Sequence, residues 1–261
     1  MSNVNQTNID RWSGFADIYN ASRPVPPDII TQSILIYLES PPELVVDIGS
    51  GTGLSTMIWR GIVPKIIGIE PNDDMRVRAG ESAAPNITYQ DGISNQTGLP
   101  DDCANIVTIS QAFHWMDIPS TLEEVYRVLK PGGVLAIYDC DWPPSIDWRI
   151  EQAYNALRRK CKIIEAKKEK PATQHDKSSY IDAFNAFGKF KFTKEIVLHS
   201  VEPCTPERMI GIALSQGAMQ EALKLDPSIQ EDINAFCDLI RERRSGSFDI
   251  VFSYRLRLAI K

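Results

Sequence analysis

Short apolar runs rich in Val and Ile recur through the first half of the chain, and helical stretches separate them. None of these runs alternates with polar residues, so each is expected to be a strand buried on both faces. The connections between them, about a dozen residues or longer, suit helices that cross over between parallel strands. The expected strands are 44–48, 65–69, 87–90, 105–110 and 134–138.

Apolar positions at helical spacing, ended by Pro or Gly, predict the helices. The last run of the chain, 248–260, instead alternates apolar and polar residues, which predicts an antiparallel pair with the run at 191–199 at the end of the sheet. The helices are expected at 27–38, 52–61, 73–83, 121–129, 148–168, 178–187, 206–218 and 228–243.

Composition narrows the classes of function. The 261 residues include 28 Lys or Arg and 34 Asp or Glu, a net charge of -6, which disfavours nucleic acid as a partner. No apolar run approaches the roughly 18 residues of a membrane span, and the polar first ten residues resemble no secretion signal. The 5 Cys and 3 His are too scattered for a disulfide framework or a metal site, so we expect a cytoplasmic protein without a metal.

The most informative stretch is the glycine-rich turn Asp47-Ile48-Gly49-Ser50-Gly51-Thr52-Gly53, which follows the first strand. Glycines there let a ligand approach the main chain without meeting a Cβ atom. A dinucleotide fingerprint would need a third glycine where Leu54 stands, and the carboxylate of Asp47 would repel phosphate. The turn therefore predicts a nucleoside without phosphate, with Asp47 accepting hydrogen bonds from a ligand ammonium group or through water.

Two more carboxylates follow the next two strands. Glu70, about 20 residues past the turn, is expected to accept both hydroxyls of a ribose. Asp91 is expected to accept a hydrogen bond from an adenine amino group. All three acids fall at the carboxyl ends of strands, the edge of an open α/β sheet at which ligands bind.

Taken in order, these features resemble the class I S-adenosylmethionine-dependent methyltransferases. The resemblance also rests on Gly98-Leu99-Pro100 and on Leu129-Lys130-Pro131-Gly132-Gly133, which precede the fourth and fifth strands. It implies an α/β fold with a seven-stranded, Rossmann-like, doubly wound sheet in the order 3-2-1-4-5-7-6, the last strand antiparallel. It also implies S-adenosylmethionine as cofactor and S-adenosylhomocysteine as product.

Two motifs resemble the small-molecule branch that includes trans-aconitate methyltransferase-like proteins: Tyr19-Asn20-Ala21-Ser22-Arg23-Pro24 and Gln111-Ala112-Phe113-His114-Trp115. The resemblance implies that Tyr19 and Arg23 close over the cofactor, with the guanidinium available to its carboxylate. Ser50 and Gln111 are assigned to the same cofactor site.

The acceptor site is predicted from residues near that edge. His114 is a candidate general base or substrate donor, and Trp115 and Trp142 are expected to line the acceptor. The domain plan has a cofactor-binding core with N-terminal helices at 1–141, a helical cap insertion at 142–188 and the rest of the sheet at 189–261. Chain order places Trp142 and Trp148 in the cap over the acceptor.

The predicted reaction is direct in-line methyl transfer to an oxygen or nitrogen of a small molecule, with an anionic acceptor as one option. A carboxylate acceptor needs no base, whereas a phenol, alcohol or ammonium must lose a proton. Two alternatives stay open: a non-catalytic protein that binds S-adenosylmethionine or S-adenosylhomocysteine, and a nicotinamide-dependent oxidoreductase. The sequence indicates neither the acceptor nor the oligomeric state.

Overall fold

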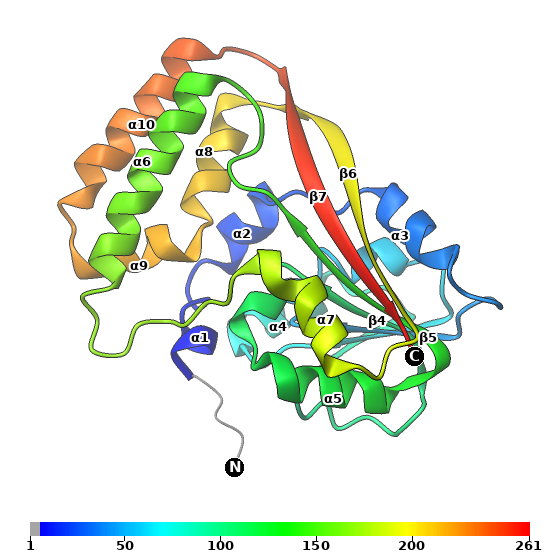
Figure 1. The fold of residues 1–261 in the computed structure, drawn as a ribbon. Coiled ribbons are helices and arrows are strands. Elements are labelled where there is room, and N and C mark those ends of the chain that lie inside the picture. The colour runs from blue at the N-terminus through cyan, green and yellow to red at the C-terminus, as the bar shows by residue number, and fades with distance from the viewer. Residues whose placement is uncertain (1–5) are drawn as a thin grey trace.

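A mixed seven-stranded sheet in the order β3-β2-β1-β4-β5-β7-β6 runs through the molecule, in a computed structural model that describes residues 6–261 (Figure 1). Strands β1 to β5 are parallel, and β7 is antiparallel to both of its neighbours, β5 and β6, which confirms the predicted order. The strands are β1 (Leu44–Ile48), β2 (Lys65–Ile69), β3 (Ile87–Gln90), β4 (Ala104–Ser110), β5 (Leu129–Cys140), β6 (Phe192–Cys204) and β7 (Phe248–Ile260).

Burial explains why these runs form strands. Every residue of β1 is buried, as expected for an apolar strand covered on both faces. The predicted antiparallel pair is confirmed, because β6 and β7 pair in register along their whole length. The edge of the sheet is β6, whose residues are mostly exposed or half-buried, while β7 lies between β5 and β6.

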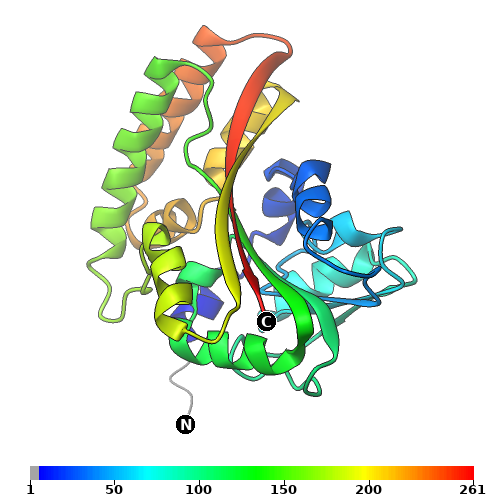
Figure 2. The same cartoon turned by 45° about the vertical axis from the view of Figure 1, so that its right-hand side comes forward.

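Helices cover both faces of the sheet. One face packs against α3, α6 and the three helices α8 to α10, and the other against α5 and α7 (Figure 2). The helices are α1 (Gln6–Asp10), α2 (Ala16–Ser22), α3 (Asp28–Leu35), α4 (Asp73–Glu81), α5 (Ile118–Val128), α6 (Trp148–Glu165), α7 (Tyr180–Phe187), α8 (Pro206–Leu214), α9 (Gly217–Leu225) and α10 (Ile229–Arg243), with short 3-10 helices η1 (Met57–Trp59), η2 (Phe113–Trp115) and η3 (Lys177–Ser179).

Two helix predictions need correction. The predicted helix over 52–61 is wrong, because only the 3-10 helix η1 forms there, among turns. The side chains of Ser55 and Thr56 bond the carboxylate of Asp47 instead, and Thr and Ile in this stretch have modest helix propensity. The predicted helix over 206–218 is two helices, α8 and α9, with Ser215 and Gln216 between them.

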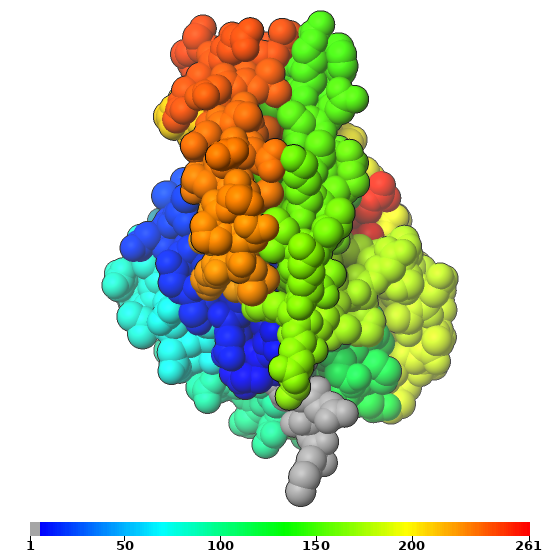
Figure 3. Space-filling view, turned by 90° about the vertical axis from the view of Figure 1, so that its left-hand side faces the viewer, coloured from blue at the N-terminus to red at the C-terminus, as the bar shows by residue number. Residues whose placement is uncertain are grey.

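The predicted cap, 142–188, occupies three places in the fold. Helix α6 packs with α9 and α10 and lies beside α10 across one side of the molecule (Figure 3). Residues 166–176, without regular structure, run from α6 past α1, and α7 packs against α5 (Figure 1). Trp148 is 64% exposed. The position of the domain boundaries stays a prediction.

Within residues 6–261, no helix is long and apolar enough to cross a membrane. The same part of the chain contains no group of three or more His, Cys, Asp or Glu side chains that could hold a metal ion. All five cysteines are free thiols, and four of them are buried.

Candidate functional site

A cavity of about 310 Å³ lies at the carboxyl ends of β1 to β4. The strand ends supply one side of its wall, and the side opposite comes from α1 and from the segment that leads to η3. A second cavity of about 50 Å³ adjoins it and shares Tyr19, Gly49, Gly51, Ser110 and Gln111 with it. The larger cavity is placed where an open α/β sheet binds its ligands.

The glycine-rich turn forms part of both walls. Gly49 and Gly51 have positive φ angles of 71° and 55°, a conformation that side chains rarely adopt. A Cβ atom at Gly51 would meet open space, whereas one at Gly49 would lie 2.7 Å from the Cβ atom of Ala112. The turn therefore presents bare main chain to a ligand.

A side chain at Gly53 and a side chain at Gly51 would lower the free energy of unfolding by different amounts. Gly53 lines neither cavity and has a φ of 87°, and its Cβ atom would collide with the ring and hydroxyl of Tyr89. We expect Gly53→Ala to lower the free energy of unfolding by about 2–4 kcal/mol, from backbone strain and the collision together. Gly51→Ala, with strain alone, is expected to cost about 1 kcal/mol. Urea unfolding of both variants checks this order, and equal losses would contradict it.

Asp47 is fully buried and forms part of neither cavity wall. Its Oδ2 accepts hydrogen bonds from the hydroxyls of Ser55 and Thr56, each at 2.7 Å, and its Oδ1 accepts one from Thr108 at 2.7 Å. Burial raises the pKa of this carboxyl, and the three hydroxyls oppose the rise. The carboxylate is thus satisfied by the protein and fixes the glycine-rich turn to β4, so this placement does not support direct contact with a ligand.

Glu70 follows β2 and lies on the wall of the larger cavity with 7% of its surface exposed. Its Oε2 accepts a hydrogen bond from the backbone N–H of Gly51 at 2.9 Å, and its Oε1 one from Asn72 at 2.9 Å. Burial raises the pKa of Glu70 to about 7, although these backbone donors and Arg76 oppose the rise. Each oxygen retains a lone pair for a ligand hydroxyl.

Asp91 points away from the site. Its side chain is 76% exposed, lines neither cavity, and pairs with Arg76 at 3.5 Å. The residues after it, 92–95, line the larger cavity in its place, including the polar side chains of Ser94 and Asn95. These residues, rather than Asp91, therefore present polar side chains to the larger cavity.

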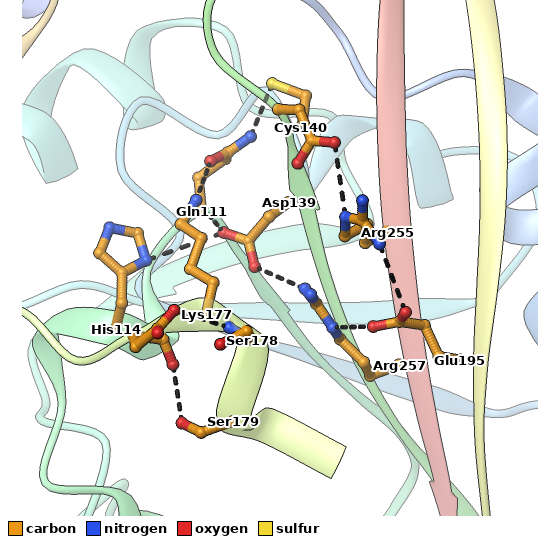
Figure 4. Close-up of polar contacts among 12 residues, drawn as sticks. Gln111, His114, Asp139, Cys140, Lys177, Ser178, Ser179, Glu195, Arg255 and Arg257 are labelled. Carbon is orange, nitrogen blue, oxygen red and sulfur yellow. Dashed lines mark hydrogen bonds and ion pairs between the residues drawn. The ribbon is translucent and has the colours of Figure 1, made fainter.

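His114 is also absent from both walls. Its ring packs against Trp115, with 4.8 Å between ring centroids, and its Nδ1 lies 3.7 Å from Oδ1 of Asp139 (Figure 4). Burial, and secondarily the charges of Lys177 and Arg11, hold the pKa of His114 well below its usual value. His114 is therefore a buried imidazole off both cavity walls, and its placement does not support a base acting on a bound acceptor.

The aromatic residues of the two motifs do reach the cavities. Trp115 lines the larger cavity, Trp142 the smaller one, and Tyr19 both. Arg23 lies in the smaller cavity between the rings of Tyr19 and Trp142, at 4.8 and 4.7 Å from their centroids. Its Nε and Nη2 donate to the hydroxyl and carbonyl oxygens of Ser215, which leaves N–H groups on Nη1 for a ligand.

Gln111 lies where the two cavities meet, with a positive φ of 53° that is rare for a residue other than glycine. Its amide bonds the thiol of Cys140 and the ammonium group of Lys177 (Figure 4). Ser50 lines the smaller cavity, and its buried hydroxyl has no partner among the described residues. Strained backbone and an unpaired polar atom are both frequent at ligand sites.

Sequence reasoning missed the side of the cavity opposite the strands. That side includes Asn8, Ile9 and Trp12 of the N-terminal segment, and Thr173 and His175 of the segment before η3. Trp12, an aromatic residue in a polar stretch, was the one local signal for it. The others lie in stretches without apolar periodicity, so only the folded chain brings them to the site.

The residues present fit adenosine linked to an amino acid. A nucleoside suits the larger cavity, which offers it bare main chain at Gly51, the carboxylate of Glu70 and apolar neighbours. Among the described residues, no Lys or Arg lines this cavity to hold a phosphate. The unpaired hydroxyl of Ser50 and the guanidinium of Arg23, in the smaller cavity, suit an amino-acid group. This is the set of groups that S-adenosylmethionine requires.

Comparisons with known proteins agree with this fit. Residues 46–137 match the family model of a methyltransferase domain. A candidate methyltransferase of Dictyostelium discoideum is 28% identical over 129 residues, 49% of this chain and 48% of that protein. The chain thus matches about half the length of that curated relative.

Solved structures show the same fold. A candidate type II methyltransferase from Anaeromyxobacter dehalogenans superposes with a TM-score of 0.68 at 16% identity, over 91% of this chain and 97% of that one. An N-methyltransferase from Haemonchus contortus, solved with S-adenosylhomocysteine, has a TM-score of 0.54 at 13% identity, over 97% of this chain and 60% of that one. The family model, the strand order and the cavity therefore agree: residues 46–137 match a methyltransferase domain, the chain has the fold of the class I S-adenosylmethionine-dependent methyltransferases, and these findings support S-adenosylmethionine as its cofactor.

Proposed function

We propose that the protein transfers a methyl group from S-adenosylmethionine to an oxygen or nitrogen of a small, uncharged molecule in the larger cavity. The observation that carries the proposal is the wall of that cavity, which joins a nucleoside-binding carboxylate, Glu70, to an apolar region around Trp12 and Trp115. Room beside a cofactor site, lined by aromatic rings, is typical of a site for a second small molecule.

Each part of the wall has a role in holding the cofactor. Glu70 accepts hydrogen bonds from the ribose hydroxyls, and the main chain of Gly49 and Gly51 lets the amino-acid part approach closely. Arg23 and Ser50 bind the carboxylate of that part in the smaller cavity. When bound, S-adenosylmethionine supplies a methyl group whose leaving group is a neutral thioether. The protein therefore needs mainly to align the acceptor and exclude water.

The charge of the larger cavity favours an uncharged acceptor. Its wall carries the carboxylates of Glu70 and Asp117, and no Lys or Arg among the described residues. A carboxylate acceptor would be desolvated there without a cationic partner, which costs several kcal/mol. A phenol, an alcohol or a neutral amine meets no such cost, so this proposal replaces the anionic acceptor that the sequence left as an option.

A phenol, an alcohol, or a primary or secondary amine must lose a proton when it is methylated. The imidazole on the wall of the larger cavity that could accept this proton is that of His175. It lies on the same side as Thr173, is exposed, and can pass the proton to water. With an acceptor identified, we expect His175→Ala to lower kcat by about 100-fold at unchanged affinity for S-adenosylmethionine. His175→Gln is the control for size. Turnover that survives both changes would exclude His175 as the base.

Two measurements test the proposed function together. Calorimetric titration should show micromolar binding of S-adenosylmethionine and S-adenosylhomocysteine, and no binding of NAD. A screen of phenols, alcohols, amines and carboxylic acids with a labelled methyl donor should then find turnover among the uncharged compounds. Preference for carboxylic acids would contradict the uncharged acceptor, and tight binding without turnover across the panel would favour the non-catalytic alternative.

A further inference from the structure

The larger cavity is closed on one side by two segments that are far apart in the sequence. We call them the roof: α1 with its following residues, 6–13, and the segment 173–177. Asn8 joins them, because its amide nitrogen donates to the carbonyl of Thr173 at 3.1 Å and its amide oxygen accepts from the N–H of Thr173 at 3.0 Å. The N–H of His175 in turn donates to the carbonyl of His114 at 2.8 Å. Residues of both roof segments line the larger cavity.

The segment 173–177 ends in a contact with the interior of the sheet. The ammonium nitrogen of Lys177 lies 2.7 Å from Oδ1 of Asp139 and donates to Oε1 of Gln111 at 3.1 Å (Figure 4). A lysine can only donate, so the atom of the Gln111 amide that faces it must be the oxygen. The amide nitrogen of Gln111 is then turned toward Cys140, as the hydrogen bond to the thiol shows.

The other cation that pairs with Asp139, Arg257, is fixed by the sheet. Arg257 on β7 pairs with Asp139 on β5 at 3.3 Å and with Glu195 on β6 at 2.8 Å, and these three strands are neighbours. Asp139 and Arg257 are each 2% exposed. Lys177 comes from η3, outside the sheet, and its side chain is 27% exposed. Lys177 can therefore leave Asp139 while β5, β6 and β7 remain paired.

The charges around Asp139 favour the arrangement in which Lys177 contacts it. With Lys177 in place, the buried carboxylate of Asp139 faces two cations, Lys177 at 2.7 Å and Arg257 at 3.3 Å. If Lys177 leaves, Oδ1 of the buried Asp139 loses that cation, and Asp139 keeps Arg257, which also pairs with Glu195. Buried charge without a partner is costly, whereas an exposed ion pair contributes little. The carboxylate of Asp139 therefore attracts Lys177, and with it the segment 173–177, toward the sheet.

We propose that Lys177 is a positioning residue: it holds the roof of the cavity against the sheet and, through the same ammonium group, sets the orientation of the Gln111 amide at the junction of the two cavities. The roof then lifts only when Lys177 leaves Asp139. This inference goes beyond the proposed function, because it concerns the closure of the cavity and holds for any ligand bound there.

Hydrogen exchange of the protein without ligand tests the proposal. Lys177→Met removes the charge at similar length, and we expect exchange of the N–H groups of Thr173 and His175 to rise about tenfold or more. Lys177→Arg should restore protection to within about threefold. The control is Lys189→Met, which removes an exposed ion pair with Glu123 and should leave the roof unchanged. Equal exchange in the Lys177→Met and Lys189→Met variants would overturn the proposal.

A second variant covers the case in which Lys177→Met unfolds the protein. Asp139→Asn combined with Lys177→Met leaves Arg257 and Glu195 as a neutral pair, so β5 and β7 should keep their protection while the roof loses it. A roof that stays as protected as in the unmodified protein would refute the proposal that Lys177 holds it. In the same variants, release of S-adenosylhomocysteine should be about tenfold faster, which needs no turnover. Unaltered release would also contradict the proposal, and failure of the methyl-transfer screen would not affect it.

Discussion

Glu70→Gln is expected to weaken the binding of S-adenosylmethionine by about 2–3 kcal/mol, or ~30- to 150-fold. The ribose hydroxyls would lose a charged acceptor. The amide nitrogen of the new side chain would also face a backbone donor, because both oxygens of Glu70 accept N–H groups, from Gly51 and Asn72. Calorimetry at pH 8 measures the loss. Glu81→Gln, at an exposed acid on the end of α4, should bind as the unmodified protein does.

The raised pKa of Glu70, about 7, gives this prediction a pH dependence. The ribose hydroxyls bond the ionised carboxylate, so binding favours loss of the proton. Affinity should rise about tenfold between pH 6 and pH 8, with proton release on binding near pH 7, and Glu70→Gln should lack both effects. In the ligand-free protein, this acid has a higher pKa folded than unfolded, so its contribution to stability falls as pH rises from about 4.5 to about 7. A flat pH profile would contradict the assignment of Glu70.

Asp47→Ala is expected to lower the free energy of unfolding by about 3–5 kcal/mol, the largest stability loss that we predict. Three buried hydroxyls, those of Ser55, Thr56 and Thr108, would lose their acceptor at once. Binding of S-adenosylmethionine should fail as well, because the turn next to Gly49 would no longer be fixed. Urea unfolding and calorimetry measure the two effects.

Asp91→Ala is the matched control, since it removes a carboxylate that directly follows another strand of the same sheet, β3. Its side chain is exposed and off the cavity wall, so stability should change by less than about 0.5 kcal/mol and affinity not at all. A strong loss of affinity in Asp91→Ala, with normal stability of Asp47→Ala, would reverse the roles that the structure gives to these two acids.

The sheet could be predicted from the sequence because its signal is local. Continuous apolar runs such as 44–48 predict strands buried on both faces, and the alternation of 248–260 predicts the antiparallel pairing. The predicted helix over 52–61 failed for a reason that is not local. Its Ser and Thr residues bond Asp47 in the completed fold, and one more hydroxyl on that carboxylate, that of Thr108, is 61 residues away.

The sequence motifs indicated where the larger cavity lies but only some of the residues that line it. The motifs locate Glu70, Tyr19 and Gln111 on the cavity walls, yet no spacing rule says which way a side chain at a strand end will point. His114 turns toward Asp139 inside the molecule, and the closing side depends on Asn8 and Thr173, which are 165 residues apart. Such contacts arise from tertiary packing, so the pattern of residues along the chain could not reveal them.

The central claim is that the cavity at the carboxyl ends of β1 to β4 holds the adenosine part of S-adenosylmethionine. A crystal structure of the protein with S-adenosylhomocysteine tests this most directly. We expect both ribose hydroxyls to lie within hydrogen-bond distance of the Glu70 carboxylate, and the amino-acid group to lie near Arg23. Adenosine bound elsewhere, or a ribose that makes no contact with Glu70, would contradict it.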